Sequence, residues 1–154
     1  VYYIQGDKLD AWKGTESKIV TDKKRTILKL LSPVPMLTGK STVELDGETA
    51  PRKVEGARPE FYFRLSDFES FAIVRLTPKK GGTRIVENVS TLSLKGERWI
   101  DETRQIVPTF KKQEDDNLYK IWPEKPLETG EYALMQFTDG KLNPQIWDFS
   151  VAAK

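Results

Sequence analysis

Carboxylates are the side chains of this sequence that could most directly carry out catalysis. They cluster in three places: Asp101 and Glu102; Glu114, Asp115 and Asp116; Glu124 and Glu128. Two carboxylates that face each other across a cleft, roughly 5–10 Å apart, could cleave a glycosidic bond by acid–base chemistry. Adjacent acids in one loop do not indicate such a pair, and runs of this kind usually solubilise the loop. We therefore predict no catalytic residue, with a carboxylate-dependent carbohydrate-active enzyme as an alternative.

The acidic run that begins at Glu114 could also offer oxygen ligands to calcium, a hard cation. The spacing of an EF-hand loop is absent, however, and Asp-Asp-Asn ahead of a strand is typical of a turn. The sequence has no histidine and no cysteine. This excludes imidazole and thiolate metal ligands, disulfides, and nucleophilic triads built on an imidazole base. We predict no metal and no cofactor.

The aromatic residues are the strongest indication of binding, with four Trp and five Tyr in the chain. Trp147 alternates with Phe149, which predicts a position in the core. Trp12, Trp99 and Trp122 lie beside charged residues, turns or a proline, where an indole could stack on a sugar ring or anchor a protein partner. We predict an interaction surface at these three residues. The alternative is that each indole covers the edge of its own core.

Charge and composition restrict the partners. Lys and Arg number 25 against 23 Asp and Glu, the net charge is +2, and the two signs are interspersed along the chain. Binding to nucleic acid normally requires a larger cationic excess on one face, so we expect none. No apolar run approaches the roughly 18–20 residues that span a bilayer, so we expect no membrane insertion. Because the chain opens at Val1 without an initiator Met, we expect a removed signal segment and a periplasmic, cell-surface or secreted domain.

Short strands must position these side chains, because period-two alternation dominates and turn signals recur every 8–12 residues. The strongest alternation is at 60–66, where Phe61 and Phe63 share one face and Tyr62 and Arg64 the other. We expect further strands at 1–5, 9–12, 18–21, 26–31, 42–45, 71–77, 84–89, 106–110, 118–121, 131–137 and 145–151. The length of 154 residues fits one domain. We predict a sandwich core at 41–154 with an N-terminal elaboration at 1–40.

One local motif has a named geometry. Residues 127–134, LETGEYAL, have the form L-x-x-G-x-Y-x-L. This motif resembles the tyrosine corner of immunoglobulin-like folds, in which a tyrosine hydroxyl bonds back to the backbone of a loop that crosses between two sheets. The resemblance implies that Tyr132 holds such a crossover between strands at 118–121 and 131–137. Stretches such as LYKIWP at 118–123 and WDF at 147–149 are also similar to uncharacterised bacterial exported domains.

We therefore predict an all-β fold: a two-sheet antiparallel sandwich, immunoglobulin-like, with extra N-terminal strands or a hairpin. Fold alone does not define function. We expect a non-enzymatic binding or structural module outside the cytoplasm of a bacterium, with a protein or a glycan as partner. A carbohydrate-binding module is the main alternative.

Overall fold

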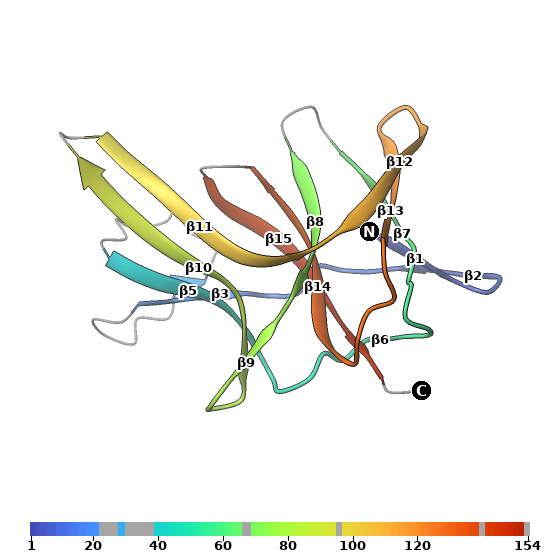
Figure 1. Cartoon of the computed structure of the whole chain (residues 1–154), viewed down its shortest axis with the longest axis horizontal. Helices are drawn as coiled ribbons and strands as arrows, with labels where there is room; N and C mark the ends of the chain where they lie inside the picture. Colours follow the sequence, from blue (N-terminus) through green and yellow to red (C-terminus); the bar gives the residue numbers. More distant parts are fainter. Residues whose placement is uncertain (22–27, 30–38, 66–68, 95–96, 139–140, 153–154) are drawn as a thin grey trace.

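The computed structural model describes residues 1–21, 28–29, 39–65, 69–94, 97–138 and 141–152 (Figure 1). Its strands are β1 (Tyr2–Gln5), β2 (Lys8–Ala11), β3 (Lys18–Thr21), β4 (Leu28–Lys29), β5 (Gly39–Asp46), β6 (Lys53–Val54), β7 (Phe61–Arg64), β8 (Ser70–Arg75), β9 (Thr77–Lys79), β10 (Thr83–Leu94), β11 (Glu97–Val107), β12 (Thr109–Asp115), β13 (Leu118–Pro123), β14 (Gly130–Thr138) and β15 (Lys141–Val151). The protein is all-β, as predicted. Among the described residues, no helix is long and apolar enough to cross a membrane.

The N-terminal hairpin predicted from the sequence is present. β1 and β2 pair in antiparallel register, with Tyr2 opposite Ala11 and Gln5 opposite Lys8. Gly6 in the turn has φ of +57°, a left-handed conformation that glycine adopts at low cost. β1 pairs with β7 and β3 pairs with β5, so strands from the first forty residues add to both sheets. The division into an elaboration and a core stays a prediction.

The strands form two sheets in a sandwich-like arrangement. The smaller sheet has five strands in the order β12-β13-β7-β1-β2. The larger one has ten and follows β4-β3-β5-β10-β11-β8-β14-β15-β6, with β9 beside β10. One pair departs from the expected antiparallel pattern, because the loop after β5 brings β6 alongside β15 in the same direction.

β11 connects the two halves of the larger sheet. Most of it pairs with β10, from Glu97 opposite Leu94 to Arg104 opposite Glu87, while its last residues 105–107 pair with β8. Pro108 then interrupts the ladder, because proline has no backbone N–H to donate. The chain continues as β12 in the smaller sheet. The prediction of one strand at 106–110 was therefore wrong, since Pro108 divides that segment between two sheets.

Two hydrophobic clusters fill the fold, one on each face of β8 and β14. Phe71 and Ile73 of β8 belong to the cluster beneath the five-stranded sheet. The alternate residues Ala72 and Val74 belong to the cluster shared with β3, β5 and β10. In Figure 1, β8, β14 and β15 accordingly lie between the two groups of strands. A strand covered on both faces is apolar without interruption, as β8 is from 71 to 74.

The crossover expected near Tyr132 is also present. β13 and β14 lie in different sheets, so residues 124–129 cross between them. The buried Tyr132 hydroxyl donates a hydrogen bond of 3.0 Å to the carbonyl oxygen of Glu128. Burial raises the pKa of the phenol, and nearby Arg75 opposes that change. The local geometry predicted from L-x-x-G-x-Y-x-L is therefore confirmed.

Candidate functional site

Of the three tryptophans predicted to form a surface, Trp12 and Trp122 lie on opposite faces of the smaller sheet. Trp12 is half-buried under the N-terminal hairpin, where its ring centroid lies 5.3 Å from that of Tyr3 and 5.4 Å from that of Phe61. Its carbonyl oxygen accepts a hydrogen bond of 3.1 Å from the Trp147 indole. Trp12 thus closes the edge of the core, which was the alternative interpretation. The side chain of Trp99 lies outside the described residues.

Trp122 lies on the opposite face of the smaller sheet. Along β13, Ile121 is fully buried against the core, so its neighbours Lys120 and Trp122 point outward. The ring centroid of Trp122 lies 5.7 Å from that of Phe110 on β12. The Lys120 ammonium lies 4.8 Å from the centroid of Trp122 and 6.0 Å from that of Tyr62 on β7. These four side chains therefore form one contiguous surface.

The register of the sheet extends this surface to β1, because Tyr2 is the partner of Tyr62. We call Tyr2, Tyr62, Phe110, Lys120 and Trp122 the aromatic face. Four strand separations from β2 to β12 give the sheet a width of about 19 Å. Tyr2 and Phe110 are the most exposed members, at 42% and 47%. The aromatic face thus crosses four strands of the sheet, from β1 to β12.

Charged groups border the aromatic face. Lys120 donates a hydrogen bond of 3.0 Å to Glu60, and this bond raises the pKa of the lysine. Lys112, whose partner across the strands is Lys120, forms an ion pair of 3.0 Å with Glu114. Arg64 at the end of β7 is exposed. The surface thus combines apolar rings with hydrogen-bond donors and acceptors.

Sequence reasoning missed four members of the aromatic face, Tyr2, Tyr62, Phe110 and Lys120. A signal was available for Tyr62, because it alternates with Phe61 and Phe63, both buried. An aromatic residue on the outer face of a half-buried strand is exposed by the same period that buries its neighbours. Tyr2 comes next to it only through the β1–β7 pairing, which no local pattern indicates.

One carboxylate of each acidic cluster named from the sequence is held in an ion pair. These pairs join Glu102 to Arg104, Glu114 to Lys112, and Glu128 to Arg75. Asp115 accepts the backbone N–H of Asp116 in a turn that ends at Asn117, whose φ is +61°. Among the described residues, no group of three or more Asp or Glu is placed to hold a metal ion.

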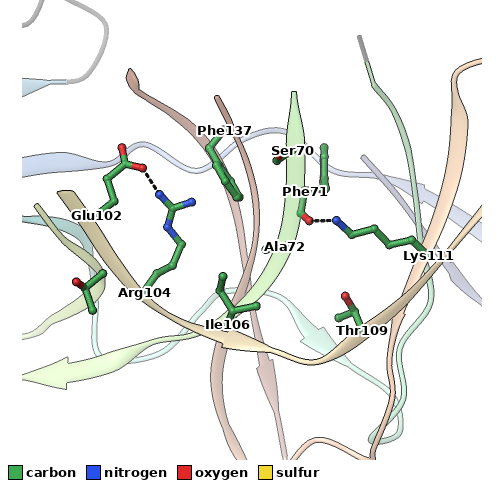
Figure 2. A pocket seen from close by; sticks show the side chains of 10 residues that line it. Ser70, Phe71, Ala72, Glu102, Arg104, Ile106, Thr109, Lys111 and Phe137 are labelled. Carbon is green, nitrogen blue, oxygen red and sulfur yellow. Dashed lines mark hydrogen bonds and ion pairs between the residues drawn. The ribbon is translucent and has the colours of Figure 1, made fainter. Parts of the chain in front are cut away.

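A pocket of about 670 Å³ lies where β11 separates from β8 (Figure 2). Its lining comes from the start of β8, the middle of β11, the start of β12 and the end of β14: Ser70, Phe71, Ala72, Glu102, Thr103, Arg104, Ile106, Thr109, Lys111 and Phe137. At one side the buried Arg104 guanidinium lies over the Phe137 ring, 4.0 Å from its centroid. Across the pocket the Lys111 ammonium donates a hydrogen bond to the Phe71 carbonyl oxygen.

Arg104 also contacts Glu87, a buried residue of β10. The arginine Nε lies 3.0 Å from Glu87 Oε2 as an ion pair, but the two groups are not aligned as a hydrogen bond. Burial raises the pKa of Glu87 to about 7, and Arg104 opposes that rise. Glu87 therefore titrates near neutral pH although it does not face the solvent.

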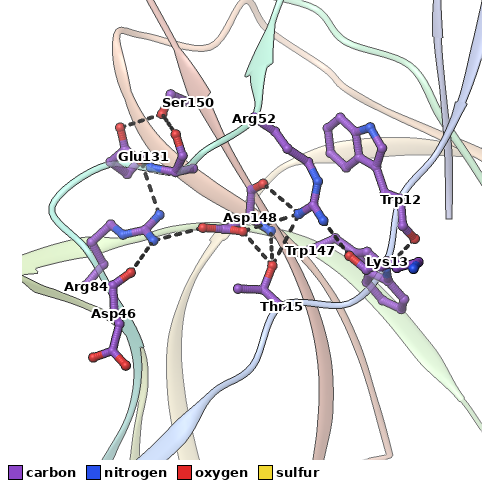
Figure 3. Close-up of polar contacts among 11 residues, drawn as sticks. Trp12, Lys13, Thr15, Asp46, Arg52, Arg84, Glu131, Trp147, Asp148 and Ser150 are labelled. Carbon is purple, nitrogen blue, oxygen red and sulfur yellow. Dashed lines mark hydrogen bonds and ion pairs between the residues drawn. The ribbon is translucent and has the colours of Figure 1, made fainter.

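A second polar cluster lies inside the fold and centres on Arg84 of β10 and Asp148 of β15 (Figure 3). Arg84 Nη2 lies 2.8 Å from Asp148 Oδ2, and Nη1 lies 3.3 Å from Glu131 Oε2. Asp148 also accepts the Thr15 hydroxyl at 2.6 Å and lies 3.4 Å from Nη1 of Arg52. The exposed fractions of the Arg84 and Asp148 side chains are 1% and 0%. The cluster joins distant segments of the chain and has a structural role.

Comparisons of the chain with models of protein families, with curated proteins and with solved structures give no match. The aromatic face therefore carries the functional argument.

Proposed function

We propose that this protein is a non-enzymatic binding module that recognises a glycan through the aromatic face. The observation that carries the proposal is the contiguous row Tyr62–Lys120–Trp122–Phe110 on the outside of the five-stranded sheet, extended by Tyr2. Exposed large apolar side chains that gather in one patch tend to mark interaction sites.

The chemistry of the aromatic face matches that of a sugar. An aromatic ring offers a flat apolar surface with a negative face, on which the C–H groups of a pyranose can pack. Glu60 and Lys120 beside the rings offer an acceptor and donors for hydroxyl groups. Lys120 covers part of Trp122, so ligand binding would rearrange this long, flexible side chain. A surface that crosses four strands favours an extended chain over a small ligand that needs enclosure.

We include in this proposal an immunoglobulin-like domain located outside the cytoplasm. Support for the fold comes from the Tyr132–Glu128 hydrogen bond at a crossover between sheets. Secretion or surface display would give a glycan-binding module access to polysaccharide. Cell fractionation with antibodies to the protein tests the location.

A glycan array with the purified protein tests the function, followed by titration of the best ligand. We expect Trp122→Ala and Tyr2→Ala each to weaken binding about tenfold, equivalent to about 1.4 kcal/mol. Ile106→Ser is the matched control, because Ile106 is 58% exposed and lines the pocket shown in Figure 2. The proposal is wrong if no glycan binds, or if binding is indifferent to changes on the aromatic face. Loss of binding to a purified protein partner in the same variants would assign the face to that partner instead.

A further inference from the structure

The pocket in Figure 2 is separate from the aromatic face and has the size of a ligand site. Its volume of about 670 Å³ lies within the usual range of roughly 300–1,000 Å³. It exists because β11 pairs with β8 only over residues 105–107 and then departs at Pro108. The first residues of β8, 70–72, pair with β14 on their other side. Space therefore remains beside them, open to solvent.

One end of the pocket is cationic. Lys111 projects from β12 toward β8, and its ammonium is bonded to the carbonyl oxygen of Phe71. Among the described residues, no carboxylate forms an ion pair with Lys111, in contrast to Lys112, which pairs with Glu114. Ser70 and Thr109 also line the pocket (Figure 2). Burial lowers the pKa of Lys111, as expected for an ammonium without an anionic neighbour.

The middle of the pocket is apolar. Ile106 is 58% exposed, although it is a branched aliphatic side chain on a central strand. Ala72 and Phe137 form the opposite wall. Beyond them, the guanidinium of Arg104 is already paired with two carboxylates, from Glu87 and Glu102. Lys111 is therefore the cation available to a ligand, and Ile106 is the apolar surface that a ligand could cover.

We propose that this pocket binds a carboxylate carried on a short apolar body, with the carboxylate paired to Lys111 and the body packed on Ile106. The anion would supply the charge partner that Lys111 lacks, and a charge-assisted hydrogen bond in a partly buried site is stronger than a neutral one. Ser70 and Thr109 would donate from their hydroxyls to the same group. A free organic acid and the carboxyl end of a peptide both have this chemistry.

The test is a titration of the purified protein followed by backbone amide NMR, with hexanoate and acetyl-Gly-Ala-Leu as probes. Hexanamide and the amidated peptide are their neutral counterparts, and hexylammonium has the opposite charge. We expect at least one carboxylate probe to bind and to shift the amide signals of Phe71 and Ile106. The neutral counterparts should bind about tenfold more weakly. Binding of hexanoate alone would assign the site to small acids, and binding of the peptide alone to carboxyl termini.

Variants separate the pocket from other surfaces. Lys111→Gln should lower the affinity about tenfold, Lys111→Arg should retain binding, and Ile106→Ser should weaken it. Lys112→Gln on the neighbouring residue is the matched control and should change nothing. Equal binding of hexanoate and hexanamide to the wild-type protein would overturn the proposal, even if Lys111→Gln does not fold. So would the absence of binding by both carboxylate probes. Trp122→Ala should leave binding of the carboxylate probes intact, so the test of the pocket is independent of the test of the aromatic face.

Discussion

Replacement of Arg84 by Met tests how strongly the buried polar cluster in Figure 3 stabilises the fold. The change keeps an apolar stem but removes the ion pairs to Asp148 at 2.8 Å and Glu131 at 3.3 Å. It also removes the hydrogen bonds that Arg84 donates to the carbonyl oxygens of Asp46 and Gly47. Asp148, whose side chain is fully buried, then keeps Arg52 as its remaining cation, with the nitrogen 3.4 Å away.

The expected cost follows from that geometry. Removing one partner of a buried ion pair typically destabilises a protein by about 3–5 kcal/mol, because a buried charge is left uncompensated. Domains are stable by about 5–15 kcal/mol in total, so Arg84→Met should remove a large part of the stability. Arg52→Met is the matched control. Arg52 is a quarter exposed and lies farther from Asp148, so its loss should cost about 1 kcal/mol.

Urea unfolding followed by tryptophan fluorescence measures both free energies of unfolding, provided the m-value stays constant. A third variant isolates the cause. If the uncompensated charge is responsible, adding Asp148→Asn to Arg84→Met should restore about 1–2 kcal/mol. The reasoning is refuted if Arg84→Met costs no more than Arg52→Met, or if the double variant is no more stable than Arg84→Met alone.

Three further changes have expected outcomes of their own. Tyr132→Phe removes the hydrogen bond to Glu128 and should cost about 0.5–1.5 kcal/mol in the same urea assay; an unchanged midpoint would contradict the role of the crossover bond. Glu87 has a pKa raised from 4.5 to about 7, so its contribution to stability is fully present below pH 4.5 and falls by about 3 kcal/mol as the pH rises through 7. Glu87→Gln cannot lose a proton, so its stability relative to the wild type should increase over that range, and a difference that is flat with pH would argue against the raised pKa. Gly47 has φ of +88° and an added Cβ would lie 3.4 Å from the carbonyl oxygen of Thr49, so Gly47→Ala should lower the melting temperature. Gly14→Ala is the control and should have a smaller effect, because its added Cβ would lie 3.7 Å from the nearest atom, an ordinary van der Waals distance.

The features predicted correctly from the sequence are those fixed by neighbouring residues. The alternation of Phe61 and Phe63 with Tyr62 places one set in the core and the other outside, whatever sheet the strand joins. Gly6 and Asp7 close the first hairpin through local backbone geometry. The bond from Tyr132 reaches back only to Glu128, so a short motif was sufficient to predict it.

The separation of Trp12 from Trp122 could not be predicted from the sequence, because it depends on residues that are distant along the chain. Trp12 comes directly before Lys13 and Trp122 directly before Pro123, yet one closes the core and the other lies on the outer face. Local sequence cannot distinguish these positions, because the difference depends on which strand is the neighbour. The same holds for β11, whose residues pair with β10 and then with β8.

The sequence by itself determined which side-chain chemistry the chain lacks and that its strands alternate with a period of two residues. Without His or Cys, no imidazole or thiolate mechanism is open, and alternation at two residues per repeat forms sheets. The tertiary structure alone decided which side chains meet. Tyr2 comes beside Tyr62, Lys111 faces β8, and Arg84 reaches Asp148, because strand pairing brings distant residues within a few ångströms. Binding surfaces and buried ion pairs depend on such distances, and a linear sequence does not contain them.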